Sequence, residues 1–112
     1  MLSGLKQITL DGTVKIHYLW NGETMNYKFN EDTNLQELKA YIDGTYGEHY
    51  ASDKYQATDV IIDSGHGEGF ALGNILKYAK RYGNKEGKNR KDLLKILHYA
   101  IIMLNIHDTE NK

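Results

Sequence analysis

The stretch GFALGNILKYAKRYG, residues 69–83, decides the fold because it carries two stripes of different chemistry at helical spacing. At about 100° per residue, the apolar stripe comprises Leu72, Ile75, Leu76 and Ala79. The polar stripe comprises Asn74, Lys77 and Arg81. A purely structural helix needs only the apolar stripe. The polar stripe is therefore the first candidate for function, either as an anion-binding surface or as a solvated face.

A second helix follows over residues 91–107, after a polar link at 83–90. So short a link predicts that the helices of residues 70–82 and 91–107 form an antiparallel helical hairpin. The face expected to be buried on the second helix comprises Leu93, Leu94, Leu97, Ala100, Ile101 and Leu104. Another of its faces carries Asp92, Lys95 and Tyr99.

The N-terminal third predicts a three-stranded antiparallel meander, because Asp11-Gly12 and Asn21-Gly22 are strong hairpin signals. A bulge with Gly12 in the left-handed conformation is expected in the first hairpin, since it brings the apolar residues of both strands to one face. The apolar positions of the second and third strands are Val14, Ile16, Tyr18 and Trp20, then Met25, Tyr27 and Phe29.

A short helix is expected next, with Thr33 as N-cap, Gln36 completing a capping box and Gly44 ending it. Its buried stripe would be Leu35, Leu38, Tyr41 and Ile42. The apolar run Val60–Ile62 fits a strand or a helix on periodicity alone. The fold class is therefore α+β in a single domain, 1–112, with a β-meander and helix module (1–54), a helical core (55–107) and a tail (108–112).

Composition excludes several classes of function. The chain has no cysteine, so disulfides, zinc–thiolate sites and thiol nucleophiles are absent. No apolar run approaches the roughly 20 residues of a membrane span and no signal peptide is visible, so we expect a cytoplasmic protein. The net charge is −1, yet residues 77–95 hold eight Lys or Arg against only Glu86 and Asp92, a local +6 that can attract phosphates or an acidic protein.

Planar bidentate donors on Arg81 and a mobile charge on Lys77, continued by Lys85, suit phosphate binding, with Asn74 positioning the ligand. On the facing helix, Asp92 would orient Arg81 or hold Mg²⁺ through water. Gly73, inside the helix, indicates close helix packing or a ligand near the backbone. These same side chains on a short helix also fit a solvated face.

The glycine-rich loop at 65–69 is a hinge or a phosphate-binding turn, but it lacks the spacing of known phosphate loops. The histidines show no metal-ligand spacing, so no metal site is predicted. His66 is the one histidine that we retain as a candidate site residue, because it lies in this loop beside the polar stripe.

The motif G-N-x-x-K-Y-x-x-R at 73–81, followed by D-L-x-K-x-x-x-Y at 92–99, resembles a family of small phage and prophage proteins of unknown function, also labelled nucleotide kinase. The resemblance covers residues 55–104 and favours a helix at 58–63. It singles out Gly73, Asn74, Lys77, Tyr78, Arg81, Lys85, Asp92, Lys95 and Tyr99. It implies a nucleotide ligand and, for members with kinase activity, transfer of phosphate between nucleotides with Mg²⁺.

Two functions from different classes follow. The first is a phage or prophage accessory protein that binds a nucleotide or phosphate group through the basic helix, with phosphotransfer left open. The alternative is a non-enzymatic inhibitor of a host protein, such as a defence nuclease or its signalling nucleotide. A structural homo-oligomer built from packed helical hairpins is a third.

Overall fold

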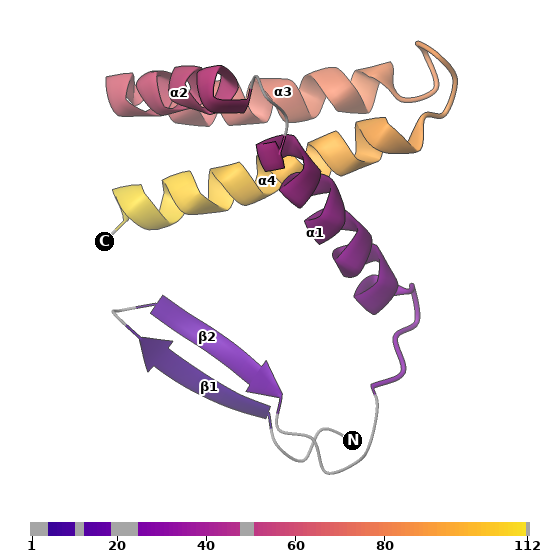
Figure 1. Ribbon diagram of the computed structural model, residues 1–112, viewed down its shortest axis with the longest axis vertical. Coiled ribbons are helices and arrows are strands. Elements are labelled where there is room, and N and C mark those ends of the chain that lie inside the picture. The colour runs from indigo at the N-terminus through magenta and orange to yellow at the C-terminus, as the bar shows by residue number, and fades with distance from the viewer. Residues whose placement is uncertain (1–4, 11–12, 19–24, 48–50, 112) are drawn as a thin grey trace. The chain divides into compact units, whose positions relative to one another are not determined.

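The computed structural model describes the backbone of residues 5–10, 13–18, 25–47 and 51–111, and the side chains of 25–47 and 56–111. In chain order the elements are two strands, two helices, a short π-helical segment and two further helices (Figure 1). The chain divides into two compact units, residues 1–32 and residues 33–112.

The first unit contains β1 (Leu5–Leu10) and β2 (Thr13–Tyr18), which pair as an antiparallel hairpin. Pairing runs without interruption from Leu10 opposite Thr13 to Leu5 opposite Tyr18. The bulge expected in this ladder is therefore wrong, because two residues suffice to connect the strands. Gly12 itself and the Asn21-Gly22 turn lie outside the described residues.

The expected third strand is wrong: residues 25–27 have no regular secondary structure, and residues 28–29 form a turn. In the observed register Val14 lies opposite Thr9 and Ile16 opposite Gln7, so the hairpin offers no matched apolar rows for a third strand to extend. The α+β fold with a three-stranded meander is thereby corrected. Residues 25–47 and 56–111 contain helices and no strand.

Helix α1 (Glu31–Gly47), most of which belongs to the second unit, is longer than expected at both ends. Its start is fixed by Glu31, whose Oε1 accepts a 2.7 Å hydrogen bond from the Phe29 amide, so Thr33 lies in the first turn and is not the N-cap. Gly44 does not end the helix. The Thr45 hydroxyl instead donates to the Ile42 carbonyl at 2.7 Å within the continuing turn.

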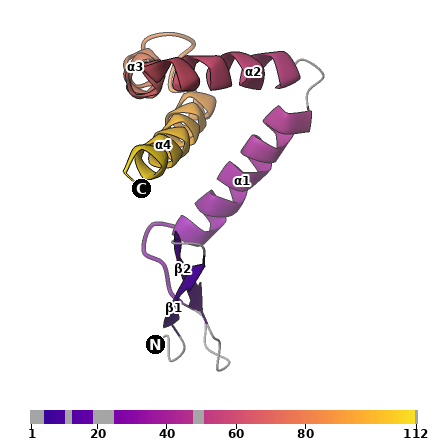
Figure 2. The same cartoon turned by 90° about the vertical axis from the view of Figure 1, so that its left-hand side faces the viewer.

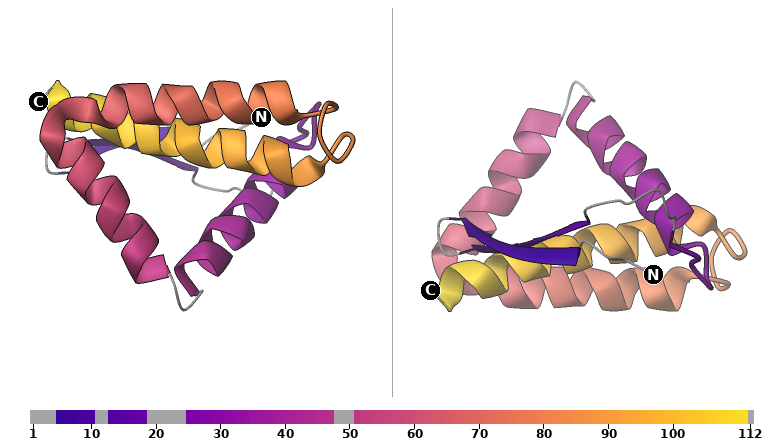
Figure 3. Two further views of the ribbon diagram at one scale, coloured as in Figure 1. Left: turned by 90° about the horizontal axis from the view of Figure 1, so that it is seen from above. Right: turned by 90° about the horizontal axis from the view of Figure 1, so that it is seen from below.

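The ambiguous run at 60–62 is helical: α2 (Ala51–Ile61) contains its first two residues and the π-helical segment η1 (Ile62–His66) begins at the third. Gly65 has φ of 90° there, a value that favours glycine, and the helix axis kinks at this point. Of the two roles considered for the glycine-rich loop at 65–69, a hinge or a phosphate-binding turn, the backbone fits the hinge. Figure 3 shows α2 leaving the line of the next helix at this kink.

The predicted helical hairpin is confirmed as α3 (Gly67–Arg81) and α4 (Arg90–Glu110), which run antiparallel side by side (Figures 1 and 2). Asn89 begins α4 as its N-cap, because its side-chain oxygen accepts a 2.9 Å hydrogen bond from the Lys91 amide. Within the link, the Gly83 amide donates to the Gly87 carbonyl at 2.9 Å.

The hairpin buries different residues from those expected. Its buried positions are Gly67, Ala71 and Tyr78 on α3, with Asp92, His98 and Ile106 on α4. The leucines predicted to be inside are largely exposed instead: Leu76 is 69% exposed and Leu104 62%. The reason is that α3 turns its small residues and its tyrosine towards α4, so the apolar stripe faces outward.

Helix α1 contacts α4 in two places. Arg90 donates to both carboxylate oxygens of Glu37, at 2.8 and 2.6 Å, and this bidentate pair holds the pKa of Glu37 below its ordinary value. Farther along, the Tyr41 ring meets the His98 ring edge to face at 6.1 Å. Of the stripe predicted on α1, Leu38 is buried, whereas Leu35 is 63% exposed.

None of the helices in the described part of the chain has both the length and the apolarity needed to cross a bilayer.

Two glycines of α3 provide a matched test of this packing. A methyl group added at Gly67 would lie 3.1 Å from both Ile106 Cδ1 and Ile62 Cγ1, whereas one added at Gly73 would meet nothing within 4 Å. Gly73→Ala should therefore raise the free energy of unfolding by about 1 kcal/mol through helix propensity. Gly67→Ala should lower it by up to about 2 kcal/mol, because overpacking outweighs that gain. Urea unfolding measures both, and equal shifts in the two variants would contradict the described packing.

Candidate functional site

The polar stripe of α3 does not act as one surface. Asn74 is half-buried, and its amide donates a 2.9 Å hydrogen bond to the Phe70 carbonyl one turn earlier. A ligand is therefore not needed to explain this residue in mid-helix. Gly73 is exposed and contacts nothing across the hairpin, so the close helix packing expected there is wrong. The close approach occurs at Gly67, which was not singled out.

Arg81 is held by carboxylates at the end of the hairpin where the link joins α3 to α4. Its Nε lies 3.6 Å from Asp92 Oδ1, and its Nη2 lies 3.5 Å from Glu86 Oε2. Asp92 is only 3% exposed, so this carboxylate sits between the helices rather than in solvent. Arg81 Nε and Asp92 Oδ2 are both buried without a hydrogen-bond partner. Orientation of Arg81, one of the two roles considered for Asp92, is the one that this geometry fits.

Two lysines converge on a single buried tyrosine. Lys77 of α3 and Lys95 of α4 place their ammonium nitrogens 4.7 and 4.9 Å from the centre of the Tyr78 ring. Tyr78 is 8% exposed. Within the described part of the chain, neither ammonium group has a carboxylate at ion-pair distance. Two cations thus share one aromatic partner, and no carboxylate among the described side chains balances them.

This cluster changes the acidity of the phenol. Burial by itself raises the pKa of Tyr78, but the positive charges of Lys95 and Lys77 and their hydrogen bonding lower it by more. The pKa of Tyr78 consequently lies below the ordinary 10.0. The site therefore stabilises negative charge at the position of this hydroxyl.

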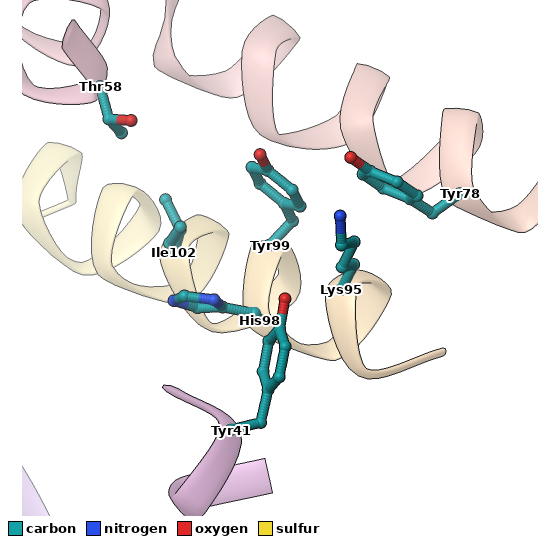
Figure 4. A pocket seen from close by; sticks show the side chains of 7 residues that line it. All are labelled: Tyr41, Thr58, Tyr78, Lys95, His98, Tyr99 and Ile102. Atoms are coloured by element: carbon teal, nitrogen blue, oxygen red, sulfur yellow. The ribbon is translucent and has the colours of Figure 1, made fainter. Parts of the chain in front are cut away.

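A second tyrosine extends the cluster along α4. The rings of Tyr78 and Tyr99 stack at 6.1 Å with 14° between their planes, and Phe70 meets Tyr99 edge to face at 5.8 Å. Figure 4 shows the Lys95 ammonium group between the two tyrosine rings. Tyr78, Lys95 and Tyr99, which the family motif selected, are therefore brought together.

The same residues border a small cavity of about 30 Å³. Its lining comprises Tyr41, Thr58, Tyr78, Lys95, His98, Tyr99 and Ile102 (Figure 4). About this volume accommodates one water molecule or the tip of a polar group. Tyr41, Thr58 and His98 were not predicted as site residues. Tyr41 was expected in the apolar stripe of its helix. The sequence positions of Thr58 and His98 give no signal that they belong to a site.

Other predicted residues lie apart from this cluster. Lys85 is exposed in the link between α3 and α4, and its amide donates to the Arg81 carbonyl at 3.0 Å. His66 is exposed at the end of η1. No group of three His, Cys, Asp or Glu side chains suited to a metal ion occurs among the described residues. Asn74, Lys77, Arg81 and Lys85 thus do not line the cavity together.

The lowered pKa of Tyr78 can be measured directly. Lys95→Met should raise it, because removal of the ammonium charge removes its attraction for the phenolate. Titration of the ¹³Cζ resonances of labelled tyrosine by NMR reports this pKa, and Tyr78→Phe assigns the signal. Lys80→Met, a change of the same charge at an exposed position of α3, should leave it unchanged. A Tyr78 pKa that is the same in Lys95→Met and in the unaltered protein would refute the cluster.

The buried carboxylate offers a stability test. Asp92→Asn should lower the free energy of unfolding by roughly 1–3 kcal/mol, because it removes the buried one of the two carboxylates that pair with the partly buried guanidinium of Arg81. Asp108→Asn, at an exposed position of the same helix, is the matched control and should change stability by less than about 0.5 kcal/mol. Equal urea midpoints for the two variants would show that the Arg81–Asp92 pair contributes nothing.

Comparisons with known proteins complete the description of the site. Residues 45–101 match the family DUF3310, described as a protein of unknown function. Among curated proteins, the alanine–tRNA ligase of Blochmanniella floridana is 26% identical over 77 residues, which cover 65% of this chain and 9% of that protein. The chain thus spans less than a tenth of the length of that relative. No solved structure matches.

The match begins in the last turns of α1 and ends within α4, so it includes the whole lysine and tyrosine cluster. The predicted resemblance to a family of unknown function is confirmed, with a start ten residues earlier and an end three residues earlier than expected. The kinase label gains no support from these comparisons. The chain belongs to the DUF3310 family, whose function is unknown.

Proposed function

We propose that the α3–α4 hairpin binds a phosphate group, carried by a nucleotide, between Lys77 and Lys95. The observation that carries this proposal is the convergence of both ammonium groups on the Tyr78 ring, with no carboxylate partner in the described residues. A phosphate carries up to two negative charges, which matches the two cations.

The chemistry of the cluster supports an anion in particular. Each ammonium group has three donors, so beyond its interaction with Tyr78 it keeps donors for the oxygen atoms of a ligand. The Tyr78 hydroxyl adds a donor at the same place. Because Tyr78 is buried, this part of the site has a lower effective dielectric than water, which strengthens its attraction for a charged ligand.

Tyr99 supplies the feature that favours a nucleotide over free phosphate. Its ring is half-buried, stacked on Tyr78 and set beside Lys95, so an aromatic surface lies within one side chain of the proposed phosphate position. Nucleobases bind proteins by stacking on such rings. The cavity is too small to enclose a base, so the ligand would lie across the hairpin surface.

Transfer of phosphate between nucleotides is the finer form of this proposal and rests on the family resemblance. The described cluster has cations and a phenol of lowered pKa, but no covalent nucleophile is required for this reaction. Catalysis would depend on positioning the phosphate and neutralising its charge, with Mg²⁺ entering together with the nucleotide. Arg81 would extend the positive surface towards a second phosphate.

Calorimetric titration tests the binding. The ligands are inorganic phosphate and the deoxynucleoside mono- and triphosphates, each with Mg²⁺. Lys77→Met and Lys95→Met should each weaken binding about tenfold or more, equivalent to about 1.4 kcal/mol for each lost ionic contact. Lys80→Met removes the same charge from α3 away from Tyr78 and should change affinity less than twofold.

Two results would contradict the proposal: no heat with any of these ligands, or an equal loss of affinity in Lys80→Met. A phosphotransfer assay on the same nucleotides then separates an enzyme from a binding protein. Silence in both measurements, with Arg81→Ala leaving the biological effect of the protein intact, would support the alternative of a non-enzymatic inhibitor of a host protein.

A further inference from the structure

One side of the α3–α4 hairpin is an apolar face without a partner among the described residues. We define this face by its members, which are Leu72, Ile75, Leu76, Leu93, Leu97, Ala100 and Leu104. Leu72 and Leu97 are 44% and 45% exposed, and Leu76 and Leu104 more so. Within residues 25–47 and 56–111, the buried apolar core consists of only Leu38, Ala71, Tyr78 and Ile106. The chain thus exposes more large apolar side chains than it buries there.

The face has the spacing of a helix–helix contact. On α4, the positions Leu93, Leu97, Ala100 and Leu104 are separated by four, three and four residues. On α3, Leu72 is three residues before Ile75 and four before Leu76. Alternation of three and four is the pattern of a seam that packs against another helix. This spacing fits a helical occupant.

A groove runs along the face between the two helices. It has a volume of about 520 Å³ and is lined by Leu72, Ile75, Ala100, Met103, Leu104 and His107. Side chains of an opposing helix can insert into such a groove as a ridge. The members of the apolar face provide that ridge themselves, since Leu76 and Leu97 project from the same surface.

The chemistry of the face is self-complementary. All seven of its members are uncharged and apolar, so a copy of the same face meets it without unpaired charge. A two-fold axis requires the same patch on both sides, which this uncharged surface satisfies. A partner that recognises acidic or basic groups would instead use the basic link between α3 and α4.

The size of the face also fits a dimer. Helix α3 has 15 residues, so it is about 22 Å long, and two adjacent helices are about 20 Å wide. The flat area is roughly 450 Å² per copy, and side-chain relief brings the total for two copies to about 1,000 Å² or more. This is the lower limit for a stable protein interface.

We propose that the apolar face is the contact surface between two copies of this chain, which join their α3–α4 hairpins into a four-helix bundle. The phosphate site stays accessible in this dimer. By helical geometry Lys77 lies about 140° around α3 from Leu72, and Lys95 about 160° around α4 from Leu97. Assembly and ligand binding thus use different sides of the same hairpin.

Light scattering coupled to size-exclusion chromatography of the full chain tests the dimer. The unaltered protein should have twice the 12.8 kDa mass of one chain. Leu76→Glu and Leu97→Glu should each weaken association at least 100-fold, because the symmetry buries two unpaired carboxylates per dimer. Leu35→Glu is the matched control: Leu35 is 63% exposed on α1, which contributes no member to the face, and this variant should remain dimeric.

A second measurement uses the unaltered protein alone. If two copies associate, its Tm should rise with protein concentration, whereas the Tm of a monomer does not. A mass of one chain at high micromolar concentration, with a constant Tm, would overturn the proposal, as would equal dissociation of the Leu35→Glu control. Phosphate affinity should be unchanged in Leu76→Glu and Leu97→Glu, so failure of the dimer and failure of the phosphate site are distinguishable.

Discussion

The contact of Tyr78 with Lys95 and Tyr99 across the hairpin is the interaction on which the arrangement of α3 and α4 depends. A tyrosine ring can fill the space between two helices while its hydroxyl contacts polar groups. Because that ring and the Asp92 carboxylate occupy the interface, the leucines of both helices cannot also lie there. One polar layer therefore sets both what the hairpin can bind and what it leaves exposed.

The elements of the hairpin could be predicted from sequence, but its orientation could not. Helical periodicity in residues 69–83 and the polar link after Tyr82 were enough to predict two antiparallel helices. Periodicity shows that an apolar stripe exists on Leu72, Ile75 and Leu76, yet it does not show which neighbour covers that stripe. The adjacent helix is the nearest neighbour along the chain, but periodicity does not show that it covers the stripe. The structure instead places Ala71 and Gly67 at the contact, where small side chains let α4 approach.

The sequence predicted only some of the residues of the candidate site, because one helix does not show which neighbours its side chains contact. Tyr78, Lys95 and Tyr99 came from the family motif, and the structure brings their side chains together. Asn74 and Arg81 came from a polar stripe, but they satisfy local partners, the Phe70 carbonyl and the Asp92 carboxylate. A stripe on one helix cannot reveal such local pairing. Tyr41 and His98 come from helices far apart in sequence and meet only through the tertiary fold.

The N-terminal prediction failed where it relied on distant pairing. Strong turn residues at Asp11-Gly12 correctly indicated a hairpin between Leu5–Leu10 and Thr13–Tyr18. A third strand needs an edge with matching apolar rows, and the observed register does not supply them. Helix α1, unlike a third strand, does not depend on a distant partner at its start, where Glu31 accepts a hydrogen bond from the Phe29 amide. The turn signal at Asp11-Gly12 was thus reliable for the adjacent strands, whereas the capping signals at Thr33 and Gly44 did not give the ends of α1.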